Sequence, residues 1–155
     1  MEITMTTYIH SITPKFEAAR RWLLFTIEAT VAVNAVGGAI WGLDGARNVP
    51  REWLDGTPFD SYVVPSLILL IAIGGGMGTA AATLLARRRR AAEFSIAAGL
   101  ILIGWITVQL LMIAPGGVSW LQPTMLATGL LVAALGWRLR RVRDMSEARS
   151  HVDPH

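Results

Sequence analysis

Hydrophobic residues fall into four long runs along the chain, separated by short stretches that hold nearly all of the charges. The runs cover about residues 22–43, 62–86, 94–114 and 120–137. Each run is close to the roughly 20 residues that an α-helix needs to cross about 30 Å of hydrocarbon. This pattern predicts an all-α integral membrane protein, folded as an antiparallel bundle of four transmembrane helices.

The polar stretches around these runs divide the rest of the chain. Residues 1–21 are predicted to form an N-terminal lead, residues 44–61 a loop, and residues 138–155 a basic tail. The first hydrophobic run, at 22–43, is longer than the core of a signal peptide, so we expect it to be retained. The sequence therefore predicts one transmembrane domain, residues 22–137, between two polar ends.

Lysine and arginine predict the orientation of the bundle, because loops rich in these residues stay in the cytoplasm. Of the 14 basic residues, 12 lie in the N-terminal lead, in the turn at Arg87–Arg90 or in the tail, which share one side of the predicted bundle. Arg47 and Arg51 lie on the other side. Both chain ends are therefore predicted to lie in the cytoplasm. The bundle itself is predicted to lie in the inner membrane of a bacterium.

Composition supports a membrane location. The 155-residue chain is 53% hydrophobic and 16% charged, whereas soluble domains carry about 25% charged residues. Its mean hydropathy is positive, at +0.47. The net charge is +3, and the arginines lie beside apolar runs. The predicted partners of Arg87, Arg88, Arg89 and Arg90 are therefore anionic lipid headgroups, and nucleic acid is not expected.

Several classes of chemistry find no support in the sequence. The absence of cysteine excludes disulfides and thiolate metal sites. His10, His151 and His155 lie in the polar ends without metal-ligand spacing, so no metal is expected. A nucleophile, a base and an orienting residue cannot be assembled. We therefore predict neither enzymatic activity nor a cofactor.

Glu28 is the most informative single residue, because a carboxyl inside a membrane span is costly unless it is neutral, paired or hydrated. At 100° per residue, Glu28 shares a stripe with four small residues, which would let another helix approach closely. These are Ala32, Ala35, Ala39 and Gly42. The second run offers a matching stripe for helix packing, through Gly74, Gly75 and Gly78. We predict that the two stripes pack together.

Two roles for Glu28 are open. In the first, the protonated acid bonds to a backbone carbonyl or to the hydroxyl of Thr79 or Thr83, and serves packing alone. In the second, it exchanges protons or cations. A glutamate in the first of four membrane helices resembles the small multidrug resistance transporters, in which such a residue couples protons to drug export. This chain is longer than that family, has a large first loop and lacks its aromatic-rich second and third helices.

Two amides, Asn34 and Gln109, lie in the outer half of the predicted spans. We expect them to make intramembrane hydrogen bonds across the first and third helices, as structural contacts. Trp105 lies one turn before Gln109 on the same helix face. The two side chains could therefore line a pocket that is both polar and aromatic.

A longer pattern extends over much of the chain. It comprises the stretch 57–69, TPFDSYVVPSLIL, then Gly75 and Gly76, a basic turn, and finally the pairs Gly104-Trp105 and Val108-Gln109. The pattern resembles a loosely defined group of small bacterial four-helix membrane proteins that have no assigned activity. The resemblance spans roughly residues 22–137 and implies the same architecture.

The function expected from the sequence is that of a non-enzymatic accessory or structural membrane protein. The alternative is a small proton-coupled transporter that uses Glu28 as its proton-exchanging carboxyl. The expected partners are the lipid bilayer and either a second copy of the chain or another membrane protein. A transporter would be expected to work as a homodimer, because four helices enclose little space.

Overall fold

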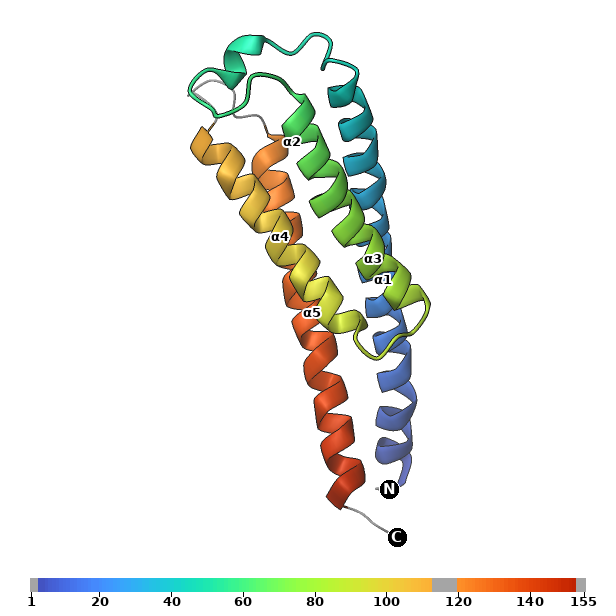
Figure 1. Ribbon diagram of the computed structural model, residues 1–155. Coiled ribbons are helices and arrows are strands. Elements are labelled where there is room, and N and C mark those ends of the chain that lie inside the picture. The colour runs from blue at the N-terminus through green and yellow to red at the C-terminus, as the bar shows by residue number, and fades with distance from the viewer. Residues whose placement is uncertain (1–2, 113–119, 153–155) are drawn as a thin grey trace.

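The computed structural model describes residues 3–112 and 120–152, and within these residues the chain is helical, without strands. Three of its segments are long and apolar enough to cross a membrane: Phe16–Leu43, Val63–Leu85 and Ala91–Met112. Four helical rods lie side by side in the described part of the chain (Figure 1). They are α1 (Ile3–Leu43), the composite rod of α2 (Val63–Ile68), η2 (Leu69–Gly75) and α3 (Gly76–Leu85), then α4 (Ala91–Met112) and α5 (Leu121–Val152).

The first and last helices of the chain, α1 and α5, are longer than the hydrophobic runs from which they were predicted. Helix α1 runs unbroken from Ile3, so the predicted N-terminal lead belongs to the same helix as the apolar run at 22–43. Helix α5 likewise continues past Trp137 to Val152, through most of the predicted tail. Arg, Glu, Ala and Met, which are strong helix formers, are frequent in residues 16–21 and 138–149. A change from apolar to polar residues therefore does not end either helix.

Both long helices project beyond the rest of the bundle at one end, where α1 begins and α5 ends (Figure 1). The turn at Arg87–Arg90 between α3 and α4 faces the same way, so we call this the arginine end. The opposite, loop end holds residues 44–62, including the short 3₁₀ turn η1 (Arg51–Leu54). The predicted turn between the third and fourth helices, at residues 115–117, lies outside the described residues.

The second rod contains a segment of π-helix that the sequence pattern did not predict. In an uninterrupted α-helix, Ser66 and Gly74 would point about 80° apart. In the structure both residues face α1. A Cβ added at Gly42 of α1 would collide with Ser66 Oγ, and a Cβ added at Gly74 would lie 3.4 Å from Cγ2 of Val36 in α1. A π-helix uses more residues per turn than an α-helix. The π segment thus returns both residues to the same face.

Helices α4 and α5 approach each other closely at three glycines. A Cβ added at Gly99 would lie 2.8 Å from both Ala133 N and Gly129 O, and one added at Gly136 would lie 3.1 Å from Ser95 Cβ. Small residues allow membrane helices to pack backbone against backbone. The sequence prediction had assigned close helix packing to small residues of the first and second runs, and had missed this second contact between α4 and α5.

Between the loop end and the arginine turn, the exterior of the bundle is mainly apolar. Large hydrophobic side chains stand outward from every rod: Val33 of α1 is 73% exposed, Ile71 of η2 is 71% exposed and Leu111 of α4 is 81% exposed. Water-soluble proteins rarely expose continuous apolar surface of this kind. The arrangement fits a multi-pass membrane protein whose outer surface is solvated by lipid.

Candidate functional site

Glu28 lies in the middle of the bundle, on the buried face of α1 between Leu24 and Val31. Its side chain is 0% exposed. Leu24 and Val31 belong to a core that also contains Met77 and Leu84 of α3, so the surroundings of the carboxyl are mainly apolar. The sequence prediction that Glu28 faces protein is therefore consistent with its position in the structure.

The Glu28 carboxyl is buried without a hydrogen bond to either oxygen within the described part of the chain. The polar side chain that faces it is Ser95 of α4, which is also 0% exposed. Ser95 Oγ already donates its proton to the carbonyl of Ala91, at 3.1 Å. What Ser95 can still offer is an acceptor lone pair. The pair therefore suits a protonated carboxyl, which would be the donor.

The hydrogen-bond partners expected from the sequence are not used. Thr79 is exposed, and Thr83 Oγ1 donates to the carbonyl of Ala80 in its own helix, at 2.8 Å. Neither oxygen of Glu28 has a hydrogen-bond partner among the described residues, so the expected bond to Thr79 or Thr83 is not made. A buried carboxylate in apolar surroundings would be very unfavourable. The site consequently requires the neutral acid for as long as the bundle stays closed.

Two of the three predicted packing glycines face α1. A Cβ added at Gly74 would be 3.8 Å from Ala35 Cβ, and one added at Gly78 would be 4.0 Å from Ala32 Cβ. Gly75 is exposed, and an added Cβ there would approach only the carbonyl of Leu70 in its own rod. Gly75 thus makes no helix contact within the described chain, because it lies on the outward side of η2.

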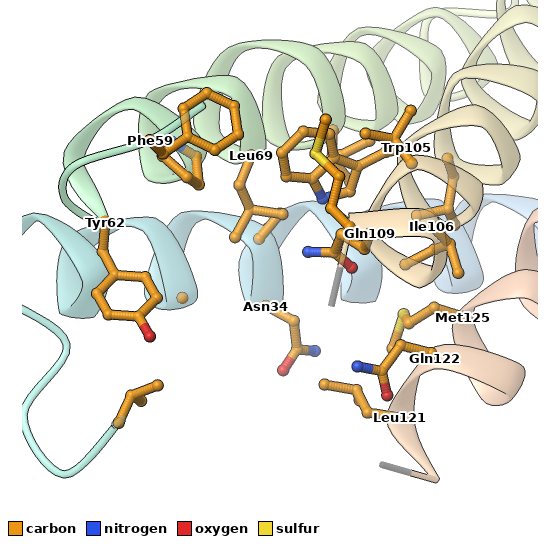
Figure 2. A pocket seen from close by; sticks show the side chains of 18 of the residues that line it. Asn34, Phe59, Tyr62, Leu69, Trp105, Ile106, Gln109, Leu121, Gln122 and Met125 are labelled. Atoms are coloured by element: carbon orange, nitrogen blue, oxygen red, sulfur yellow. The ribbon is translucent and has the colours of Figure 1, made fainter. Parts of the chain in front are cut away.

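A cavity of about 470 Å³ occupies the loop end of the bundle (Figure 2). It is bounded by α1, the rod of α2 and η2, α4, α5 and the loop at 44–62. Its wall is mostly apolar and aromatic, and no described residue in it is charged. Among the lining side chains are Trp41, Phe59, Leu69, Ile73, Ile106 and Met125. A cavity of this size and character is typical of sites for small apolar molecules.

Three amides from three different helices line this cavity: Asn34 of α1, Gln109 of α4 and Gln122 of α5. Asn34 Nδ2 donates to the carbonyl of Thr30 at 2.8 Å, within its own helix. The described residues show no hydrogen bond between Asn34 and Gln109, so the expected contact across the helices is not made. The cavity lies between them. Gln122 was missed, because a polar residue beside Pro123 reads as an ordinary helix start.

Trp105 and Gln109 both line the cavity, in agreement with the predicted pocket of aromatic and polar character. Trp105 Nε1 is buried and has no hydrogen-bond partner among the described residues. At the other side of the cavity, Tyr62 Oη donates to the carbonyl of Pro50 at 2.7 Å and so ties the loop to the start of the second rod. Figure 2 shows Trp105 and Tyr62 at opposite sides of the space.

Glu28 and the cavity are neighbours but do not meet. Val31 and Ile73 line the cavity, and Val31 lies three residues beyond Glu28 on α1, a rise of about 4.5 Å. Glu28 itself is not part of the wall. A thin apolar layer therefore separates the carboxyl from the cavity.

The arginine turn is partly engaged by α5. Arg89 Nη2 lies 2.9 Å from Glu147 Oε1, and Arg143 Nη2 lies 2.7 Å from Glu93 Oε1. Arg143 also donates to the carbonyl of Arg89. The side chains at 87, 88 and 90 are exposed and free of ion pairs with described residues. They remain suited to the predicted contact with lipid headgroups, whereas Arg89 has a partner within the chain.

The described residues contain no cluster of three or more His, Asp or Glu side chains that could hold a metal ion. No protein-family model matches the chain, and neither a curated protein nor a solved structure is significantly similar to it. Any functional conclusion therefore depends on the chemistry of Glu28 and of the cavity.

Proposed function

We propose that the chain is a multi-pass protein of a bacterial inner membrane, with four transmembrane helices and both ends in the cytoplasm. Three segments meet the length and composition of a membrane span. Helix α5 packs beside α4 through glycines, and its apolar part ends at Arg138. The arginine end of the bundle carries most of the basic residues, which favours the cytoplasmic side.

Within this architecture we propose that the protein is a small proton-coupled transporter and that Glu28 carries the proton. The observation that supports this role is the complete burial of the carboxyl among mainly apolar side chains, with Ser95 as its polar neighbour. Such surroundings hold the acid only in its protonated form, so the proton can leave only when the site opens. Buried acids inside membrane bundles commonly mark proton pathways.

The cavity at the loop end provides a route by which Glu28 could gain access to water. Separation of α1 from the second rod at Val31 and Ile73 would join the carboxyl to the cavity. The π segment η2 includes Ile73, and π turns are frequent at functional sites in helices. A proton released into the opened cavity would leave Glu28 charged and hydrated. Closure would again require the neutral form.

A static accessory protein is the second candidate function. The observation in its favour is that Glu28 is sealed on all sides in this structure, with Ser95 as the polar side chain that faces it. In that role the apolar exterior would contact lipid and a partner, either a second copy or another membrane protein. Glu28 would then never need to exchange its proton.

The two functions differ in what Glu28→Gln does. Glutamine has nearly the same size as glutamate but neither gains nor loses a proton near neutral pH. In vesicles that contain a trapped pH-sensitive dye, we expect wild-type protein to speed the decay of an imposed pH gradient. We expect the Glu28→Gln variant to decay at the rate of protein-free vesicles. Glu93→Gln is the matched control, because Glu93 is ion-paired with Arg143 at the arginine end.

Purified Glu28→Gln should elute as the wild type does and unfold at a similar temperature, because the native carboxyl is already neutral. Gradient decay that the wild type and Glu28→Gln speed equally would contradict the role of Glu28 as the proton carrier and would favour the accessory role.

A further inference from the structure

We propose that the cavity at the loop end binds a neutral, largely apolar molecule that carries a carbonyl oxygen. Its volume of about 470 Å³ lies within the roughly 300 to 1,000 Å³ of small-molecule sites. It lies away from Glu28, which takes no part in its wall. The binding proposal therefore rests on the lining of the cavity and not on Glu28, although the same cavity is the route proposed above for the proton.

The walls of the cavity select against charge. Its described lining residues include no Asp, Glu, Lys or Arg. A charged ligand would lose its hydration on entry and gain no opposite charge in return, which is highly unfavourable. The apolar side chains of Leu69, Ile73 and Ile106 instead match a hydrocarbon or aromatic body, and Trp41 and Phe59 offer ring surfaces. The ligand is therefore neutral and mainly apolar.

The polar groups of the cavity provide a donor for a carbonyl oxygen. The amide of Gln109 lines the cavity and makes no hydrogen bond with a described residue. Its Nε2 can donate, and a carbonyl oxygen has the lone pairs to accept. Trp105 Nε1 is itself buried, so Trp105 contributes its ring surface to the wall and Gln109 contributes the donor.

Two sources could supply such a molecule: an acyl ester from the membrane, or an apolar ketone or quinone dissolved in it. Both present a neutral carbonyl on a hydrocarbon body. The experiment therefore uses a probe of the shared chemistry, 4-hexylbenzophenone, whose carbonyl also forms a covalent bond with nearby C–H groups under ultraviolet light. The protein is the full chain in lipid nanodiscs, and labelled peptides are located by mass spectrometry.

We expect labelling to concentrate on cavity residues such as Ile106 and Met125. A decyl-substituted benzoquinone and a short-chain diacylglycerol are the competitors from the two sources, and the stronger one identifies the source. Decylbenzene, which lacks the carbonyl, and decanoate, which is charged, should compete poorly.

Variants test the two features of the site separately. Gln109→Met removes the amide donor and should weaken labelling by about two- to tenfold, as expected for one neutral hydrogen bond. Met125→Trp should abolish labelling by filling the cavity. Leu130→Trp is its matched control on the same helix, because Leu130 is 56% exposed and outside the cavity. Glu28→Gln should label as the wild type does.

Labelling spread evenly over the exposed surface would overturn the site, as would equal labelling of Met125→Trp and Leu130→Trp when both show wild-type thermal unfolding. Decylbenzene that competes as well as the quinone, or Gln109→Met that labels normally, would overturn the requirement for a carbonyl. Competition by decanoate would overturn the requirement for neutrality. Failure of the transport test with intact labelling would leave this binding site standing.

Discussion

Two glycines of α4 occupy opposite environments, although they lie only five residues apart. Gly99 is buried against α5, where an added Cβ would come within 2.8 Å of backbone atoms of Gly129 and Ala133. Gly104 has nothing within 4 Å of the equivalent position. Backbone cannot move aside as a flexible side chain can. The same substitution should therefore have opposite effects at the two sites.

Gly99→Ala should destabilise the folded protein by about 1 to 3 kcal/mol, the usual range for overpacking. Gly104→Ala should be neutral or slightly stabilising, since alanine favours helix by roughly 0.5 to 1 kcal/mol over glycine. The measurement is the midpoint of unfolding in mild detergent, followed by circular dichroism. Equal midpoints for the two variants would show that α4 and α5 do not pack as closely as described.

At the scale of whole elements, the part of α5 beyond Arg138 is held by polar contacts with the turn between α3 and α4. Arg89 pairs with Glu147, and Arg143 bridges Glu93 and the carbonyl of Arg89. The Arg89 guanidinium lowers the pKa of the Glu147 carboxyl from its usual 4.5. A carboxyl with a lowered folded-state pKa adds stability above its unfolded pKa and loses it as the pH falls through the lowered value.

Protection of the end of α5 from hydrogen exchange should therefore be constant near neutral pH and should decrease below about pH 4.5. The Glu147→Gln variant should have lower protection at neutral pH and should lose less of it on acidification. The effect should be small, because exposed ion pairs contribute little. Glu17→Gln, at an exposed position of α1, is the control and should behave as the wild type does. A similar pH dependence in Glu147→Gln would rule out this ion pair as the cause.

At the scale of the whole molecule, the start of α1 and the end of α5 lie at the same end of the bundle (Figure 1). This arrangement follows from an even number of antiparallel rods. The turn at Arg87–Arg90 faces the same way, and the loop with Gly56 faces the other. If all four rods cross the membrane, both helix ends must lie on the same side of it.

Reporter fusions test this topology. Green fluorescent protein at the C-terminus should fluoresce, because it folds in the cytoplasm. Alkaline phosphatase inserted at Gly56, an exposed loop position with a φ of 82°, should be active, because it folds outside. A C-terminal phosphatase that is active would mean that α5 does not cross and that three helices span the membrane.

The pattern of hydrophobic residues was enough to predict helices, their approximate apolar limits and the burial of Glu28, because each depends on solvation along a single helix. It also placed Trp105 and Gln109 on one helix face, because helical periodicity is local. The same reasoning failed at polar boundaries: helix continues through residues 3–21 and 138–152 regardless of whether lipid or water surrounds it.

The tertiary structure alone decided which groups meet. Ser95 of α4 faces Glu28, where Thr79 or Thr83 had been expected. Asn34 and Gln109 had been expected to contact each other, but they line a cavity together with Gln122. The π segment turns Gly75 outward and keeps Gly74 against α1. These outcomes depend on how far the rods rotate and separate. Periodicity within one helix does not contain that information, because it describes each rod without its neighbours.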